Sequence, residues 1–475
     1  MRRRVAHKLS GMIADDADSA PRAVLLKAAI EPGAGAAVTI PAGFVPRDYA
    51  IYLLHVAAEV EHALLVEYLF AAYSLGGPHV PEAHRDTVRE WQTVLLGIAK
   101  EEMAHFVTVQ NVLRLLGAPL NFEREDFPWD VDFAPFAFSL ERLSAASLAR
   151  YVYVESPEQW PADAEPYRKE ITALAEAGQP AKPNRVGKLY ELMIQLLSDP
   201  DLVPESAFQA STLPYQASWD EWGRGYRDGA RGAASPGDET PDLIVQRAYS
   251  RASAVDALKA VAAQGEAPDR DTATGQHSHF RRFFELWKAF PKEGSWPAVR
   301  RLCPNPTTVR GLEGLTYIAD GQTRHWAHLL NLRYRMLLTY LAHSFQLSDG
   351  SGQHPDSEAR GLVLQATFAE MYNLRAVSNL LVTKPADEAD GPRAGPPFEM
   401  PYSLALPAAR ADAWRLHVDL IGAAKILVER LRPHASTEEK AYLDSMAAID
   451  ARRRVALDEL VEGAGGRRTR MGGWA

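Results

Sequence analysis

Cysteine is almost absent from this sequence, and positive charge is not in excess. The 475 residues include a single cysteine, Cys303, so no disulfide can form within the chain. That usage suits a reducing compartment, and we expect a cytoplasmic protein. Asp and Glu number 61 against 52 Lys and Arg, a net charge of −9, which argues against nucleic acid or an anionic membrane as a partner. We expect a small-molecule substrate, and the sequence allows a homo-oligomer.

Long hydrophobic runs without titratable residues are also missing. The most apolar stretch, residues 51–75, is interrupted by His55, Glu59, Glu61, His62 and Glu67. Each of these would be costly in lipid, so the stretch is expected to be a buried helix rather than a membrane span. Strand-like alternation of apolar and polar residues is scarce as well, which disfavours a β-sheet protein.

Apolar residues do recur at helical spacing, and this pattern predicts an all-α chain. The expected helices span 48–75, 82–116, 140–155, 186–197, 242–264, 279–290, 311–346 and 357–383, with a last pair over 408–462. Glycine and proline punctuate them, as at Gly76-Gly77-Pro78. We expect a loosely ordered lead-in over 1–45, a helix bundle over 46–303, a helical unit over 304–462 packed on it, and a disordered tail over 463–475.

The sharpest local motif lies in the second expected helix. Glu102 and His105 stand three residues apart, so both project from one face. Apolar neighbours such as Ile98 and Phe106 place that face in a core. Carboxylate-bridged dimetal bundles use this Glu-x-x-His arrangement. A buried carboxylate must bind a cation or take up a proton, although the same spacing on a surface is common by chance.

The first expected helix offers a second buried carboxylate. Its stripe from Leu54 to Ala72 is apolar except for Glu61, which is what a metal site in a bundle core requires. Because this helix is apolar all round, periodicity does not choose between Glu59, Glu61 and Glu67. Glu59 and His62 even form a rival Glu-x-x-His motif.

A series of short motifs resembles the ferritin-like domain of the iminophenylpyruvate dimer synthase (violacein-pathway synthase) family, in that family's order. The matches are LLVEYLFAAYSL at 64–75, IAKEEMAHFVTVQNVLRLL at 98–116, YVYVESP at 151–157, GKLY at 187–190, QGE at 264–266, HSHF at 277–280, NP at 305–306, LRYRML at 332–337 and GPPFE at 395–399. Together they cover roughly residues 48–400. The resemblance implies a ferritin-like four-helix bundle with long irregular connections.

The resemblance also implies a set of metal ligands. It selects Glu61 on the first helix, and the implied ligands are Glu61, Glu102, His105, Glu266 and His279, with Glu155 as the third-helix carboxylate. Glu191, after Tyr190, is the rival of Glu155 for that last position.

Carboxylate and imidazole ligands without thiolate suit iron, one or two ions, or manganese, rather than structural zinc. The resemblance implies an iron-dependent oxidative enzyme of specialised metabolism that acts on an amino-acid-derived imine or amine. The alternative is a non-catalytic metal-binding or scaffold protein of a biosynthetic cluster. Five aromatic residues are candidates for lining a pocket, although each is more often an ordinary core residue: Tyr68, Tyr73, Phe106, Tyr151 and Tyr190.

Overall fold

The computed structural model describes most of the chain. The described residues are 38–41, 43–129, 136–179, 183–222, 226–227, 230–231, 243, 245–270, 275–292, 294–350 and 357–464. The expected lead-in over 1–45 and the expected tail over 463–475 lie almost entirely outside them. The described chain divides into two compact units, one ending at Asn305 and the other beginning at Pro306.

The first unit is helical. Its α-helices are α3 (Pro46–Ser74), α4 (Arg85–Leu115), α5 (Ala145–Val154), α6 (Arg168–Glu176), α7 (Val186–Ser198), α8 (Trp219–Trp222), α9 (Arg251–Glu266) and α10 (His279–Ala289). Short 3-10 turns occupy Glu82–His84, Glu165–Tyr167, Glu205–Ala207 and Ala210–Tyr215. Strands β1 (Tyr226–Arg227) and β2 (Ala230–Arg231) form a two-residue antiparallel ribbon.

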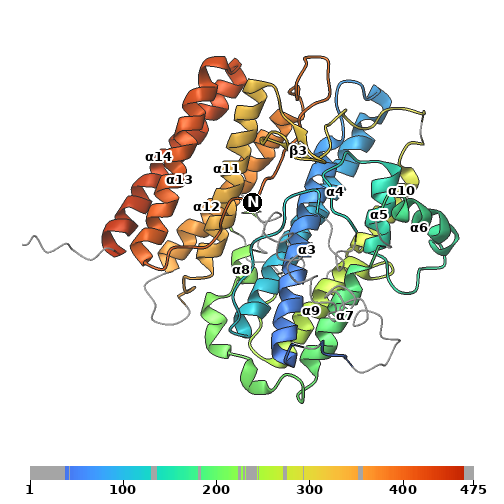
Figure 1. Ribbon diagram of the computed structural model, residues 1–475, viewed down its shortest axis with the longest axis vertical. Coiled ribbons are helices and arrows are strands. Elements are labelled where there is room, and N and C mark those ends of the chain that lie inside the picture. Colours follow the sequence, from blue (N-terminus) through green and yellow to red (C-terminus); the bar gives the residue numbers. More distant parts are fainter. Residues whose placement is uncertain are drawn as a thin grey trace, which may run out of the picture. The chain divides into compact units, whose positions relative to one another are not determined.

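The bundle combines one long helix pair with two short pairs (Figure 1). The long helices α3 and α4 pack along each other, while α7 packs on α9 and α5 packs on α10. Both short pairs contact the long pair, through α3 with α7 and through α4 with α9 and α10. The four short helices therefore begin or end inside the unit. Helix ends carry unpaired backbone groups that need partners, so these ends are natural places for polar side chains.

Serine side chains set the starts of three of the short helices. Ser144 and Ser250 each form a reciprocal capping box with the serine three residues later, and Ser278 accepts a hydrogen bond from the Arg281 N–H. Helices α5 and α9 accordingly begin later than the expected starts at 140 and 242. Helix α6 was not predicted, because it is only nine residues long and just two of them, Ile171 and Ala175, are buried.

Helix α3 is long and apolar enough to cross a membrane by length and composition alone. However, 72% of its most apolar window is buried inside the protein. Its polar residues Glu61, His62 and Glu67 are buried too, at 1%, 0% and 2% exposure. In this structure α3 is a core helix, which is what the titratable residues in the stretch indicate.

The second unit contains α11 (Gly321–Ser344), α12 (Ser357–Leu381), α13 (Arg410–Leu431) and α14 (Thr437–Ala464), with a 3-10 turn at Arg432–His434. Strands β3 (Pro306–Thr307) and β4 (Thr316–Tyr317) pair in parallel. Helix α11 packs on α12 and α13, and α13 packs on α14, around a core that includes Met336, Trp414 and Leu457. Helix α11 begins ten residues after the expected start at 311, because Asp320 caps it by accepting the Thr323 N–H at 2.7 Å.

Candidate metal centre

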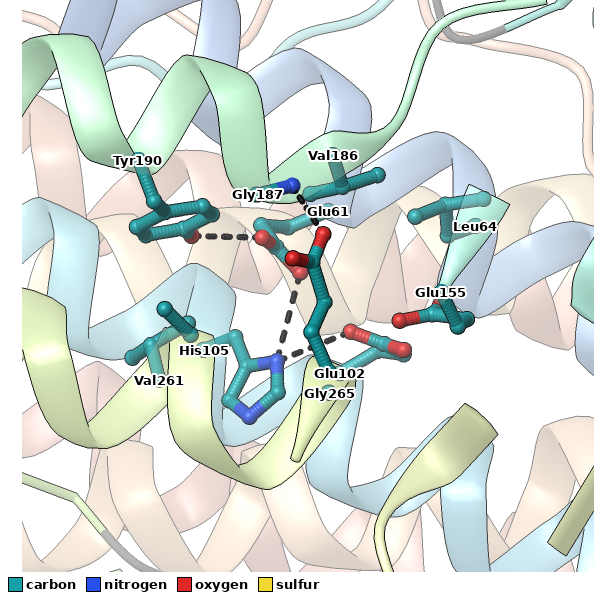
Figure 2. Close-up of a pocket in the computed structure, with 12 residues that line it drawn as sticks. Glu61, Leu64, Glu102, His105, Glu155, Val186, Gly187, Tyr190, Val261 and Gly265 are labelled. Carbon is teal, nitrogen blue, oxygen red and sulfur yellow. Dashed lines mark hydrogen bonds and ion pairs between the residues drawn. The ribbon is translucent and has the colours of Figure 1, made fainter. Parts of the chain in front are cut away.

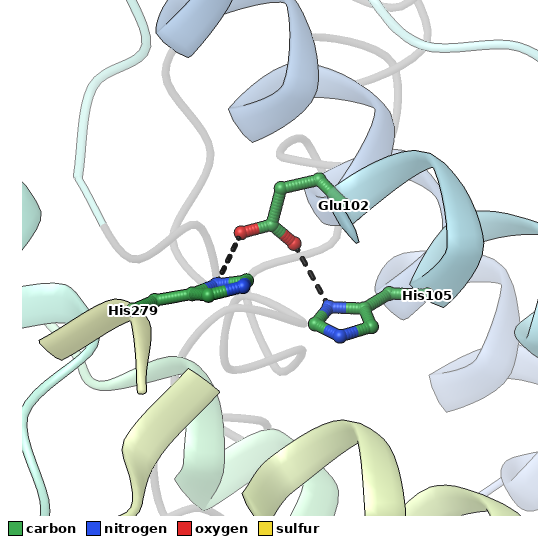
Figure 3. Close-up of side chains that lie close together, drawn as sticks. All are labelled: Glu102, His105 and His279. Atoms are coloured by element: carbon green, nitrogen blue, oxygen red, sulfur yellow. Dashed lines mark hydrogen bonds and ion pairs between the residues drawn. The ribbon is translucent and has the colours of Figure 1, made fainter. Parts of the chain in front are cut away.

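Three of the expected ligands meet in the interior of the first unit (Figure 3). Glu102 Oε2 lies 2.9 Å from His105 Nδ1, and Glu102 Oε1 lies 2.9 Å from His279 Nδ1. Ligand atoms of these three residues all fall within 4.8 Å of one another, and all three residues are buried. Helix α4 supplies Glu102 and His105, while His279 is the first residue of α10. Glu102 thus lies between two imidazoles, one on each of its oxygens.

Two further carboxylates flank this trio. Glu61 Oε2 lies 3.4 Å from His105 Nδ1, and Glu155 Oε2 lies 3.8 Å from His279 Nδ1. Glu61 comes from the middle of α3, whereas Glu155 is the C-cap residue of α5. The arrangement has two similar halves, Glu61 with His105 and Glu155 with His279, which share Glu102.

A tyrosine holds the outer oxygen of each flanking carboxylate. The Tyr190 hydroxyl donates to Glu61 Oε1 at 2.5 Å, and the Tyr68 hydroxyl donates to Glu155 Oε1 at 2.7 Å (Figure 2 shows the Tyr190 contact). Burial raises the pKa of both tyrosines well above the usual value, so both keep the proton they donate. Each flanking carboxylate is therefore fixed by one oxygen and presents the other to the centre.

The inward atoms of this group have no hydrogen-bond partner. Among the described residues, Glu61 Oε2, Glu102 Oε1 and His279 Nδ1 are buried and form no hydrogen bond of acceptable geometry, although the last two lie 2.9 Å apart as an ion pair. A buried polar atom left unsatisfied costs about 1–3 kcal/mol, and more if it is charged. Three such atoms around one point are hard to explain as packing, and a metal cation bound there would satisfy them together. The donor set fits a metal.

The pKa values of these side chains in the absence of a metal also indicate that a cation is missing. Burial raises the pKa of Glu61 to about 8 and that of Glu155 to about 7, and the nearby Glu102 charge adds to both shifts. Burial also opposes ionisation of Glu102, but His279 and His105 outweigh it and hold that pKa well below the usual range. Despite burial, the carboxylates raise the pKa of His279 to about 9. Without metal the centre retains protons, which a cation would displace.

The far nitrogens of both imidazoles are also engaged. His105 Nε2 is 2.9 Å from Gln264 Oε1, and His279 Nε2 is 2.9 Å from Glu101 Oε2. Arg282 in turn donates to both Glu101 oxygens. Because an acceptor at Nε2 favours the proton there, both rings would present the Nδ1 lone pair to the centre once a cation displaces the Nδ1 proton. These partners orient the two histidines as metal ligands require.

Glu266 reaches the same cavity in a different way. Its carboxylate accepts the Gly187 N–H at the start of α7, with the Arg185 guanidinium 4.0 Å away. Within the described part of the chain it forms no hydrogen bond or ion pair with either histidine. A Cβ atom at position 187 would lie 1.7 Å from Glu266 Oε2, so only glycine admits this carboxylate. Glu266 lines the centre, held at its edge.

The space that these groups enclose is small. Its volume is about 10 Å³, which is the room of about one water molecule. Glu61, Glu102, His105, Glu155 and Glu266 line it, together with Tyr190 and small or aliphatic residues of α7 and α9. An ion fits within this volume, whereas an aromatic molecule does not.

The structure separates the alternatives on the first helix. Glu59 accepts a hydrogen bond from Asn121 Nδ2 at 3.1 Å instead of facing the centre. The His62 ring packs against Phe106 with centroids 4.9 Å apart, and burial lowers its pKa well below the usual value. His62 is therefore a neutral core histidine. Glu61 is the residue of this group that lines the centre.

The third-helix alternatives are separated in the same way. Glu155 is 3% exposed and faces His279, whereas Glu191 lies on the exposed side of α7. Glu155 therefore occupies the position that the resemblance left open between the two.

The candidate pocket aromatics divide into two groups. Tyr190 and Tyr68 bond to the flanking carboxylates, as described above. Tyr151 packs edge-on against the Tyr68 ring at 4.8 Å, Phe106 packs against the His62 ring, and Tyr73 is buried near the end of α3. The last three are core residues.

Sequence reasoning missed the residues that orient the histidines. Glu101 is next to Glu102 in the sequence, and Gln264 is two residues before Glu266. The histidines that Gln264 and Glu101 contact lie 159 and 178 residues away, respectively. No local pattern marks such contacts. The one available signal was the Lys100-Glu101-Glu102 run, which places a second carboxylate beside the ligand.

Comparison with known proteins agrees with this geometry. Residues 54–288 match the Ferritin-like family, a span that includes every residue of the centre. The match covers just under half of the chain, and the predicted all-α, ferritin-like fold is confirmed.

Two curated relatives are each 27% identical to the chain. One is dichlorochromopyrrolate synthase of Lentzea aerocolonigenes, over 76% of this chain and 36% of that protein. The other is 2-imino-3-(indol-3-yl)propanoate dimerase of Chromobacterium violaceum, over 85% of this chain and 38% of that protein. The chain therefore spans less than two fifths of the length of either relative.

A solved structure of a ferritin-like protein from Caulobacter vibrioides aligns at 15% identity and a TM-score of 0.39. That alignment covers 70% of this chain and 98% of the other. A score of this size does not by itself establish a shared arrangement of helices.

Proposed function

We propose that this chain is an iron-dependent oxidative enzyme that couples or oxidises an aromatic imine derived from an amino acid. The relative from Chromobacterium violaceum is named for dimerising such an imine, 2-imino-3-(indol-3-yl)propanoate. Both relatives are similar to this chain over most of its length. The proposal transfers the class of substrate, an imino acid with an aromatic side chain, and not the particular compound.

The observation that carries the proposal is the set of unsatisfied inward atoms around Glu102. Oxygen and imidazole ligands without thiolate suit iron, and also manganese. The centre has two halves, each with one carboxylate and one histidine around a shared carboxylate, as in two-ion bundle sites, while its enclosed space has room for about one ion. The proposal is therefore one or two iron ions. Iron bound there would supply electron transfer and the activation of dioxygen or peroxide.

The residues of the chain would perform three tasks in this reaction. Glu61, His105, Glu155 and His279 would hold the ions with Glu102 between them. Tyr190 and Tyr68 would keep the flanking carboxylates in place by donating their hydroxyl protons. The apolar residues around the centre, among them Leu64 and Val261, would exclude bulk water.

The proposed coupling requires an external oxidant. Joining two imine molecules through one new carbon–carbon bond releases two hydrogen atoms, that is, two electrons and two protons. One molecule of hydrogen peroxide accepts these two electrons and two protons and becomes two molecules of water. The coupled product should therefore have the mass of two substrates less two hydrogens, with one peroxide consumed for each product.

One observation favours a second candidate, a metal-binding protein without catalysis. The enclosed space of about 10 Å³ accepts an ion but no aromatic imine. Catalysis would require the edge of the centre to open, and Glu266 lies at that edge on α9. The second candidate requires no such opening.

The test is to load the metal-free protein with iron(II) without oxygen and to determine bound iron by elemental analysis. Freshly prepared 2-imino-3-(indol-3-yl)propanoate or its phenyl analogue is then added with hydrogen peroxide, and products are identified by mass spectrometry. The proposal expects the coupled or oxidised imine from the loaded protein and none from a His105→Ala variant. Bound iron without product or peroxide consumption would select the second candidate. Absence of iron binding would reject both.

A further inference from the structure

We propose that the first unit has a second binding site, for a small multivalent oxyanion of the phosphate type, at the end of the α3–α4 pair. A cavity of about 240 Å³ lies there, lined by Arg85, Arg89 and Arg300 together with Gln92 and the Gly76–Gly77 turn. Its position follows the last residue of α3, roughly 20 Å along the helix from Glu61 at 1.5 Å per residue. This site is therefore separate from the metal centre.

The cationic lining has little compensation from carboxylates. Within the described part of the chain, neither Arg300 nor Arg85 forms an ion pair, and no acidic residue lines the cavity. Arg89 pairs with Asp86 at 2.6 Å, but both side chains are largely exposed, so solvent screens that pair. Burial lowers the pKa of Arg300, which is the expected effect on a cation without a counter-ion. An anion in the cavity would supply the missing charge.

Capping of the end of α3 accounts for only one of these arginines, while Arg85 Nε donates to the Val80 carbonyl oxygen at 3.5 Å. Arg300 Nη1 donates to the carbonyl oxygens of Tyr73 and Leu75, and Gln92 Nε2 donates to that of Ala72 at 2.9 Å. These bonds satisfy the end of α3, whose carbonyls would otherwise repel an anion.

Arg85 and Arg89 come from a different helix and do not share in this capping. They are four residues apart on one face of α4, a spacing at which like charges repel. A bound anion between their guanidinium groups would turn that repulsion into attraction.

The glycine turn keeps the cavity open. Gly76 and Gly77 have φ angles of +87° and +117°, which favour glycine. A Cβ atom at position 76 would meet the Arg300 guanidinium at 3.4 Å, and one at position 77 would approach the His79 ring to 2.7 Å. The backbone therefore passes beneath Arg300 without a side chain that would fill the space.

The size and the donors define the class of ligand. Cavities for drug-sized molecules usually measure about 300–1,000 Å³, so this one suits a smaller species such as phosphate. Guanidinium groups bind phosphate and carboxylate oxygens through paired hydrogen bonds. A phosphate-type anion engages several of them at once, and a dicarboxylate shares this chemistry.

The experiment is isothermal titration of the full chain with inorganic phosphate at constant ionic strength. The test variant is Arg85→Gln/Arg89→Gln. The matched control is Arg415→Gln/Arg454→Gln, which removes the same charge at exposed helical positions on α13 and α14 that do not line the cavity. Circular dichroism verifies that both variants fold, and parallel titrations with sulfate, malonate and chloride identify the anion type.

We expect phosphate affinity to fall by roughly tenfold or more in the test variant, as the loss of charged hydrogen bonds implies, and to stay within about twofold in the control. Stronger binding of malonate than of phosphate would overturn the phosphate assignment. No binding of any multivalent anion at millimolar concentrations, or equal losses in the two variants, would overturn the site.

Discussion

One buried cluster of the second unit joins two arginines to two carboxylates. Arg333 Nη1 donates to Asp450 Oδ1 at 2.9 Å and to Glu370 Oε1 at 3.3 Å, and Arg453 Nη1 donates to Glu370 Oε1 at 2.9 Å. Arg333 Nη2 donates to Asp450 Oδ2, and Asn373 Nδ2 donates to Glu370 Oε2 at 2.9 Å. Two positive charges balance two negative charges, and each carboxylate oxygen accepts a hydrogen bond.

The first unit also buries carboxylates, to a similar exposed fraction, but some of their oxygens remain without a hydrogen bond. Glu61 Oε2 and Glu102 Oε1 accept no hydrogen bond, although histidine nitrogens lie nearby. Arginine, with several donors in a rigid fork, can satisfy a buried carboxylate completely, whereas an imidazole offers one donor in each direction. The comparison teaches that a buried charge cluster points to a ligand when its carboxylate oxygens remain unsatisfied, and not simply because it is charged.

The largest expected effect comes from removing a histidine of the first unit. His105→Ala deletes the group that lies between Glu102 and Glu61, so metal content should fall sharply. The loss of affinity should exceed the roughly 10–100-fold that a second-shell change costs. Elemental analysis after dialysis measures it. Glu67→Gln is the control, because Glu67 accepts the Ser139 N–H and does not line the centre. Equal losses would show that the assigned face of α3 is wrong.

Breaking the network of the second unit should act on stability instead. Arg333→Met leaves Asp450 and Glu370 buried with incomplete compensation, which should cost about 3–5 kcal/mol of unfolding free energy. Urea unfolding followed by circular dichroism measures this cost. Metal content per folded molecule should not change. Unchanged stability would mean that the ion pairs of this network do not stabilise the second unit.

A smaller effect on metal affinity is expected from a residue that orients a ligand. Glu101→Gln keeps the shape of the side chain but removes the charge facing His279 and Arg282. Metal affinity should fall by about tenfold, the lower end of the range for second-shell changes. Competition with a chelator of known affinity gives the ratio. The same substitution at Glu90, an exposed residue of the same helix, should have no effect.

A further expected effect concerns pH. Burial raises the pKa of Glu67 to about 8, so the folded protein retains a proton that the unfolded chain releases near pH 4.5. The stabilisation associated with that proton is complete below about pH 4.5 and is lost as pH rises towards 8. Glu67→Gln imitates the protonated form. In metal-free protein, its stability relative to wild type should therefore increase steadily between pH 5 and pH 8. A constant difference across this range would contradict the prediction.

Local sequence patterns predicted much of the fold. They succeeded for features that depend on residues within one or two helical turns of each other. The helices around Glu102 and Tyr340 follow from apolar periodicity, and the spacing of Glu102 and His105 places both on one face of α4. Helix starts at Ser250 and Asp320 were expected too early, because periodicity continues through residues that the capping side chains exclude.

The sequence by itself determined that the chain is helical, that α3 and α4 each carry a buried carboxylate, and which short motifs resemble the ferritin-like family. Only the tertiary structure decided that Glu61 faces the centre while Glu59 turns to Asn121, and that Tyr190 supports Glu61 from 129 residues away. The physical reason is that α3 is apolar all round, so its own pattern contains no preferred direction. That direction is set by the helices that pack against it.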